Sequence, residues 1–96
     1  MTRTLELQVK NKSGLHARPA AAFVRAAAGF RSTISLQNLT RATNAANAKS
    51  LLAVLGCGVE RGHRIMVSAE GVDEDAAITV LRALAESGFG EAPTQD

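Results

Sequence analysis

The chain of 96 residues contains no Trp or Tyr, three Phe, and a single cysteine, Cys57. One cysteine excludes an internal disulfide, which favours a reducing compartment. The scarcity of aromatics means that Ala, Val, Leu and Ile must fill the core of what is, at this length, one domain. The chain also lacks an apolar run near the ~18 residues of a membrane helix, and its N-terminus is too charged for a signal peptide. We therefore expect a cytoplasmic protein without membrane insertion.

The net charge is +2, from 11 basic and 9 acidic residues, and no run of Lys or Arg concentrates it. This excess is weak evidence for nucleic acid, because a modest basic patch equally suits a phosphate or an acidic protein partner. RNA-recognition domains stack bases on aromatic residues of their central strands. All three Phe residues lie outside the strands expected below, so we expect no nucleic-acid partner.

Three segments alternate between apolar and polar residues, as strands with one buried face do. They are Leu5–Val9, Thr33–Gln37 and Arg64–Glu70. A hairpin and a short additional strand are expected around Arg41–Asn44. The connection over Asn38–Asn47 is the least readable part of the chain.

Three further segments show helical spacing or helix-end signals. The first helix starts near Pro19, which fits only a first turn, and ends at Gly29. The second covers Leu51–Leu55, with Ser50 as its N-cap. Asp73 is expected to cap the third helix, which ends at Gly88. The expected buried residues are Ala20, Phe23, Val24 and Ala27 in the first helix, and Ala77, Val80, Leu81 and Leu84 in the third.

The order βαββαβα predicts an α+β fold. Cleanly alternating strands indicate a sheet with one wet face, so helices must cover the other. We expect an open-faced β-sandwich, a four-stranded antiparallel sheet with three helices on one face. Residues 1–90 would form this single domain and residues 91–96 a flexible C-terminal tail.

His16 follows a turn-forming loop, Asn11–Gly14, and stands just before the first helix. The first helical turn has unpaired N–H groups and a partial positive charge, which suit the oxygens of a phosphoryl group. An unperturbed imidazole is a largely neutral nucleophile near pH 7. The guanidinium of Arg18 can pair with phosphate oxygens. Together these features predict a histidine that holds phosphate.

The segment Gly14–Ala20 (GLHARPA) resembles the phosphorylation motif of HPr, the histidine-containing phosphocarrier of the bacterial phosphotransferase system. Similarity continues in Asn47–Leu52, in Gly62–Ile65 and in Ser87–Glu91, so that it spans about residues 4–91. These motifs, at this separation in a short chain, are highly specific together.

The resemblance implies that enzyme I, which draws on phosphoenolpyruvate, phosphorylates His16 on Nδ1. The group would then pass to a sugar-specific IIA-type component, with Arg18 steadying it. Such a protein is a stoichiometric carrier rather than an enzyme, needs no cofactor, and is expected to be a monomer. The sequence names neither the sugar nor the downstream partner.

Ser50 has two interpretations. As an N-cap it would stabilise its helix by about 1 kcal/mol. In a Gram-positive-like version of the family, the matching serine is phosphorylated by a regulatory HPr kinase/phosphorylase. The helix N-terminus would tolerate that charge, and the docking surface would become negative.

A docking patch for protein partners is expected beside His16. A short helix cannot bury all of its Leu residues, so part of the cluster should be exposed, with a basic rim that suits transient contacts. The expected partner-binding residues are Ala17, Arg18, Ala21, Arg25, Lys49, Leu51, Leu52 and Leu55.

Other chemistry-bearing residues receive structural interpretations. We expect His63 to be an exposed loop residue, because no second metal ligand is apparent. Cys57 is expected to be a small packed residue. The loop Gly56–Gly62 lacks nucleotide-binding spacing and precedes a strand instead of following one. Asp73–Asp75 are helix-start acids, so no metal site is expected.

Two alternatives remain open within the resemblance. One is a regulatory protein of carbon or nitrogen control that acts chiefly by binding partners, with Ser50 as its switch. The other is a carrier of the nitrogen-regulatory branch of the family instead of the sugar-uptake branch. Retention of His16 beside Arg18 argues for the carrier instead. The Asn38–Asn47 connection is a few residues longer than the usual hairpin of the family, a difference that would bear on partner choice.

Overall fold

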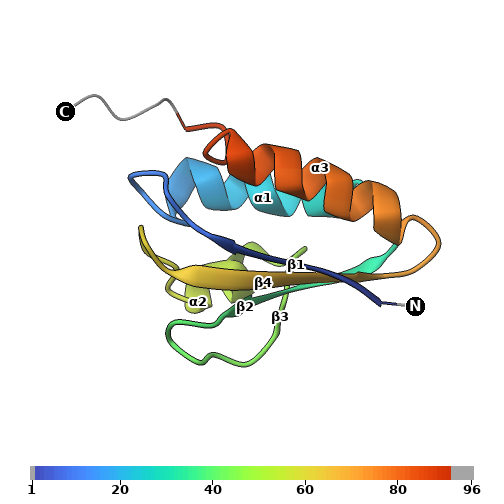
Figure 1. Ribbon diagram of the computed structural model, residues 1–96, viewed down its shortest axis with the longest axis horizontal. Coiled ribbons are helices and arrows are strands. Elements are labelled where there is room, and N and C mark those ends of the chain that lie inside the picture. The colour runs from blue at the N-terminus through green and yellow to red at the C-terminus, as the bar shows by residue number, and fades with distance from the viewer. Residues whose placement is uncertain (1, 92–96) are drawn as a thin grey trace.

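The computed structural model describes residues 2–91, and its elements follow the expected order (Figure 1). The elements are β1 (Thr2–Gln8), α1 (Ala17–Ala28), β2 (Thr33–Asn38), β3 (Ala46–Asn47), α2 (Leu51–Gly56), β4 (Arg64–Glu70) and α3 (Glu74–Glu86). Of the tail expected at 91–96, residues 92–96 lie outside the described residues.

The four strands form one antiparallel sheet in the order β1-β4-β2-β3. Its register aligns the apolar positions across strands, because Leu5 and Leu36 both pair with Val67 from its two sides. All three side chains are buried, while the neighbouring pairs of Glu6 and Gln37 with Met66 lie on the other face. The two-residue period of a strand therefore produces one apolar and one polar face.

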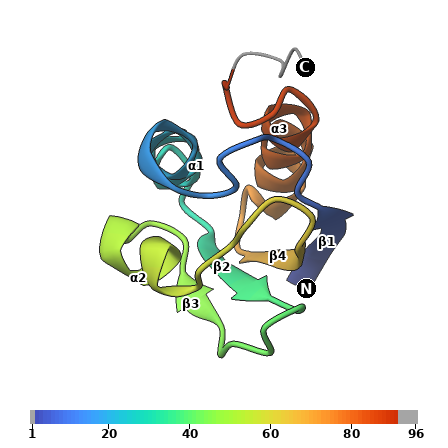
Figure 2. The same cartoon turned by 90° about the vertical axis from the view of Figure 1, so that its left-hand side faces the viewer.

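The helices cover the apolar face. α3 packs on β1 and β4, α1 packs against both other helices, and α2 lies at the β3 edge (Figures 1 and 2). Phe23 of α1 meets Phe89, just beyond α3, edge to face with ring centroids 6.1 Å apart. The expected open-faced sandwich is confirmed. Among residues 2–91, no helix combines the length and apolarity needed to cross a membrane.

The expected position of the short strand was wrong. β3 is Ala46–Asn47, whereas Arg41–Asn44 lies in the turn and the connection before it. The reason is a local polar closure at Asn38. Its side-chain oxygen accepts from the Arg41 N–H at 3.2 Å, and its backbone carbonyl accepts from the Thr43 N–H at 3.1 Å. Such an Asx closure wraps the chain before it can pair with β2.

The buried face of α3 was also partly wrong. Val80 is 44% exposed, and Ile78 is buried beside Ala77 and Leu81. At about 100° per residue, Val80 lies about 90° from the centre of the stripe that Ala77, Leu81 and Leu84 define with Ile78. Spacing alone did not fix which flank of the stripe meets the sheet.

Asp73 occupies the N-cap position of α3, but its side chain does not cap that helix. Its carboxylate instead accepts hydrogen bonds from the Arg31 N–H at 2.8 Å, the Ser32 N–H at 2.9 Å and the Ser32 hydroxyl. It therefore holds the segment that leads into β2. The Ser32 hydroxyl, with the Arg31 amide, lowers the pKa of Asp73 to about 2.

We expect Asp73→Asn to lower the melting temperature at pH 7 by several degrees. Because the pKa of Asp73 is depressed in the folded state, its stabilisation is complete above about pH 4 and is lost as the pH falls towards about 2. Thermal melts from pH 7 to pH 2 should therefore show the two proteins converging in acid. Asp75→Asn, whose exposed carboxylate makes only a solvent-screened ion pair with Arg3, is the matched control and should change little. A gap that stays constant with pH would contradict this account.

Candidate functional site

His16 is the N-cap residue of α1, in extended conformation with φ −124° and ψ 162°. Its side chain does not cap the helix, and among residues 2–91 the N–H groups of Ala17 and Arg18 have no hydrogen-bond partner. Pro19, the third helical residue, has no N–H to satisfy. The helix therefore begins with open donors and the positive end of its dipole beside an imidazole.

The chain makes a strained turn directly after the histidine. Ala17 has φ +48°, a left-handed conformation that costs a non-glycine residue about 1 kcal/mol or more. The turn joins the extended His16 to the helical Arg18. Strain of this kind persists only where surrounding contacts fix the backbone.

Those contacts come from the loop between α2 and β4. The Leu15 N–H donates to the Val59 carbonyl at 3.0 Å, and the Leu15 side chain is fully buried. Gly14, with φ +61°, lies so close that an added Cβ would stand 2.3 Å from the Val59 oxygen. A glycine is required here for both reasons, its left-handed backbone and the close approach of a second chain segment.

A second brace comes from the end of the described chain. The Glu91 carboxylate accepts from the N–H and hydroxyl of Ser13 and from the Asn11 side-chain amide. Donation by Ser13 lowers the pKa of Glu91, with further lowering by Asn11 and Lys12. Glu91 was expected to begin the flexible tail, yet its side chain secures the loop that precedes His16.

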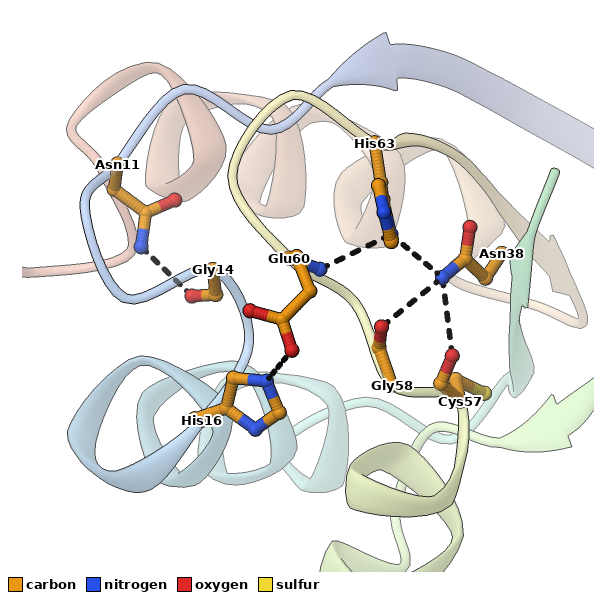
Figure 3. A network of polar contacts seen from close by, with 8 residues as sticks. All are labelled: Asn11, Gly14, His16, Asn38, Cys57, Gly58, Glu60 and His63. Carbon is orange, nitrogen blue, oxygen red and sulfur yellow. Dashed lines mark hydrogen bonds and ion pairs between the residues drawn. The ribbon is translucent and has the colours of Figure 1, made fainter. Parts of the chain in front are cut away.

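The ring of His16 is half-exposed and points at Glu60 (Figure 3). Its Nε2 lies 3.0 Å from Oε2 of Glu60, and among the described residues no partner contacts its Nδ1. Sequence reasoning missed Glu60. A carboxylate in a glycine-flanked loop gives no signal that it will meet a histidine 44 positions away.

His63 is not the exposed loop residue that was expected. It is half-buried, and its Nδ1 accepts from the Glu60 N–H at 3.1 Å. The side-chain amide of Asn38 also lies 3.1 Å from that nitrogen and donates to the Cys57 carbonyl at 3.0 Å (Figure 3). Cys57 is buried and packed, as expected. Among residues 2–91, no group of three or more His, Cys, Asp or Glu side chains is placed to hold a metal ion.

The structure brings some of the expected partner-binding residues together and separates others. Arg18 is exposed and forms no side-chain bond within residues 2–91. Lys49 donates from Nζ to the Phe30 carbonyl at 2.6 Å, just past the end of α1 opposite His16. Arg18 is thus beside the histidine, whereas the Lys49 ammonium is engaged elsewhere.

The exposed part of the leucine cluster is Leu51 and Leu52, at 43% and 83% exposure. Leu55 is half-buried against the core. The N-cap assignment of Ser50 is confirmed, since its Oγ accepts from the Ala53 N–H at 3.2 Å. Figure 2 looks at the end of the molecule where α1 begins and α2 lies beside it.

The chain is thus an open-faced α+β domain that presents one imidazole at a helix N-terminus. A family model described as "PTS HPr component phosphorylation site" matches residues 4–87. The chain belongs to this family, the HPr-type phosphocarriers of the phosphotransferase system. Sequence and structure relatives agree with that assignment.

The chain is 40% identical over 91 residues to the phosphocarrier protein NPr of Proteus mirabilis, covering 95% of this chain and 99% of that one. The solved structure of HPr-C-His from Thermoanaerobacter tengcongensis has a TM-score of 0.88 at 43% identity, covering 95% and 99%. A multiphosphoryl transfer protein of Haemophilus influenzae is 43% identical over 83 residues, 86% of this chain. The chain spans only 17% of that protein's length.

We expect Gly14→Ala to destabilise the protein strongly, because the new Cβ would collide with the Val59 carbonyl. Gly62→Ala is the matched control, since Gly62 also has a positive φ, +93°, but an added Cβ meets nothing within 4 Å. Urea unfolding should show that Gly14→Ala costs about 1–3 kcal/mol more than the control. Equal losses would show that the loops do not approach as described.

Proposed function

We propose that this chain carries a phosphoryl group on Nδ1 of His16. Phosphorylated enzyme I, charged from phosphoenolpyruvate, is the proposed donor, and IIA-type components of the sugar phosphotransferase system are the proposed acceptors. The observation that carries the proposal is which nitrogen of the His16 ring has a hydrogen-bond partner. Nε2 is engaged by Glu60, while Nδ1 has no partner among the described residues and lies at the start of α1.

The surroundings of Nδ1 suit the transferred group. A phosphoryl group there would meet the positive end of the α1 dipole and the unpaired N–H groups of Ala17 and Arg18. The exposed Arg18 guanidinium has no competing partner within residues 2–91, so it is available to pair with phosphate oxygens. We assign Arg18 the role of steadying the phosphoryl group in transfer.

Transfer between two proteins requires an open surface, because two reacting groups must meet. Along α1, Ala17, Ala21 and Arg25 recur every fourth residue and form one accessible stripe about 12 Å long. The exposed Leu51 and Leu52 lie on the neighbouring helix α2. We propose this combination, with Arg18 at its rim, as the partner-docking surface. A small apolar centre with a few charges suits brief contacts.

Incubation with enzyme I and phosphoenolpyruvate should add one acid-labile phosphate per chain. His16→Ala should take none, because it lacks the only imidazole at the α1 terminus. Labelling with radioactive phosphate, with circular dichroism to verify that the variant is folded, measures both. The proposal would be contradicted if the wild-type chain stayed unlabelled under conditions that label a known phosphocarrier.

Ser50 is proposed as a regulatory phosphorylation site for an HPr kinase/phosphorylase, and its two roles can be separated. Ser50→Ala removes the cap on the Ala53 N–H and should cost about 1 kcal/mol of stability while transfer continues. Ser50→Asp retains a capping oxygen but adds charge to the docking surface. We expect unchanged stability and slower transfer from the same donor. If both variants transfer at the wild-type rate, Ser50 is a cap and nothing more.

A further inference from the structure

The Glu60 carboxylate contacts the same imidazole that the proposed function uses. Its Oε2 lies 3.0 Å from Nε2 of His16. The Glu60 side chain is 58% exposed and the His16 side chain 39%. An ionised carboxylate can only accept hydrogen bonds, so the shared hydrogen belongs to Nε2. A neutral ring in this contact therefore has its lone pair on Nδ1.

The backbone of Glu60 is fixed on both sides. The preceding carbonyl, that of Val59, accepts from the Leu15 N–H, one residue before His16. The Glu60 N–H itself donates to Nδ1 of His63 at 3.1 Å. Because that N–H can only donate, His63 Nδ1 acts as an acceptor here. Both ends of the contact between Glu60 and His16 are thus set by one pair of adjoining loops.

The loop is in turn attached to the sheet through Asn38, at the end of β2. Asn38 is completely buried and donates to the Cys57 carbonyl at 3.0 Å, while its Oδ1 accepts from the Arg41 N–H. Because Nδ2 donates and Oδ1 accepts, the orientation of the Asn38 amide is fixed. In this orientation Nδ2 also faces Nδ1 of His63. Asn38, at the end of β2, therefore supports the loop that carries Glu60 (Figure 3).

We propose that Glu60 is a positioning residue for phosphoryl transfer. It keeps the proton of His16 on Nε2 and balances the charge that the ring acquires when Nδ1 bears a phosphoryl group. This role rests on the proposed function. It assigns a task to a side chain outside the motif that surrounds the histidine.

The step balances without any proton movement. The Nδ1 lone pair of His16 bonds to phosphorus as the bond from phosphorus to the imidazole nitrogen of the donor's phosphohistidine breaks, and the donor ring takes that electron pair. The His16 ring is now positive, because Nε2 keeps its proton and donates it in the hydrogen bond to the Glu60 carboxylate. When the group moves on to the acceptor, the electron pair returns to Nδ1 and the ring is neutral again.

The size of the effect follows from exposure. Solvent screens a pair that is about half exposed, so the carboxylate should favour the phosphorylated ring by about twofold to fivefold. Glu60 thus tunes the phosphorylation equilibrium, and its removal should not abolish transfer.

The test compares Glu60→Gln and Glu60→Ala with wild type, and uses Glu70→Gln, at an exposed carboxylate at the far end of β4, as the control. Each protein is equilibrated with the same amount of phosphorylated enzyme I, and the phosphorylated fraction is measured. We expect both Glu60 variants to lower the equilibrium constant by about twofold to fivefold and the control to leave it unchanged. A purely steric role would spare Gln, which keeps the size of the side chain.

Nitrogen NMR of the unphosphorylated proteins supplies an independent readout. Wild-type His16 should show a protonated Nε2, whereas both Glu60 variants should populate the Nδ1–H tautomer as well, because an amide can also donate and alanine offers nothing. If the wild type is phosphorylated and the Glu60 variants match it in phosphorylation equilibrium and tautomer, only the role of Glu60 is overturned. A wild type that accepts no phosphate overturns the proposed function itself.

Discussion

Two loops that are far apart in the sequence meet at the carbonyl of Val59. It accepts the Leu15 amide and lies against Gly14, where no side chain has room. Two further backbone bonds join the same two loops. The Val9 N–H donates to the His63 carbonyl, and the Gly62 N–H donates to the Val9 carbonyl. This junction fixes the backbone on which His16 is mounted and brings Glu60 to its ring. The strained Ala17 and the open start of α1 depend on it as well, since an unsupported turn would relax.

Much of the fold follows from local patterns in the sequence. Alternation in β1, β2 and β4 predicted which residues face the helices, because one face of this sheet is buried and a strand has a two-residue period. Pro19, Ser50 and the short loop before His16 predicted where helices begin. The placement of His16 at the α1 terminus was therefore predictable. The resemblance of the surrounding segment to the family motif then led to the expectation that His16 carries a phosphoryl group.

The rest depends on polar contacts that the hydrophobic pattern does not encode, most of them between distant parts of the chain. Asp73 has the sequence position of a helix cap, yet its carboxylate binds Arg31 and Ser32 because β2 enters the sheet beside it. Asn38 closes its own turn and moves β3 beyond Arg41–Asn44. Glu60 contacts the His16 ring only because its loop folds against the loop that carries His16. Asp73 and Glu60 make their bonds across the fold, whereas Asn38 combines a local turn closure with a bond across the fold to the Cys57 carbonyl.

The central claim is that Glu60 occupies Nε2 and leaves Nδ1 of His16 to react. The most direct measurement is long-range proton–nitrogen NMR of the phosphorylated protein, which identifies the ring atom bonded to phosphorus. We expect a single phosphorus bonded to Nδ1 of His16, with a proton retained on Nε2. A phosphoryl group on Nε2 of His16, or on the ring of His63, would contradict it.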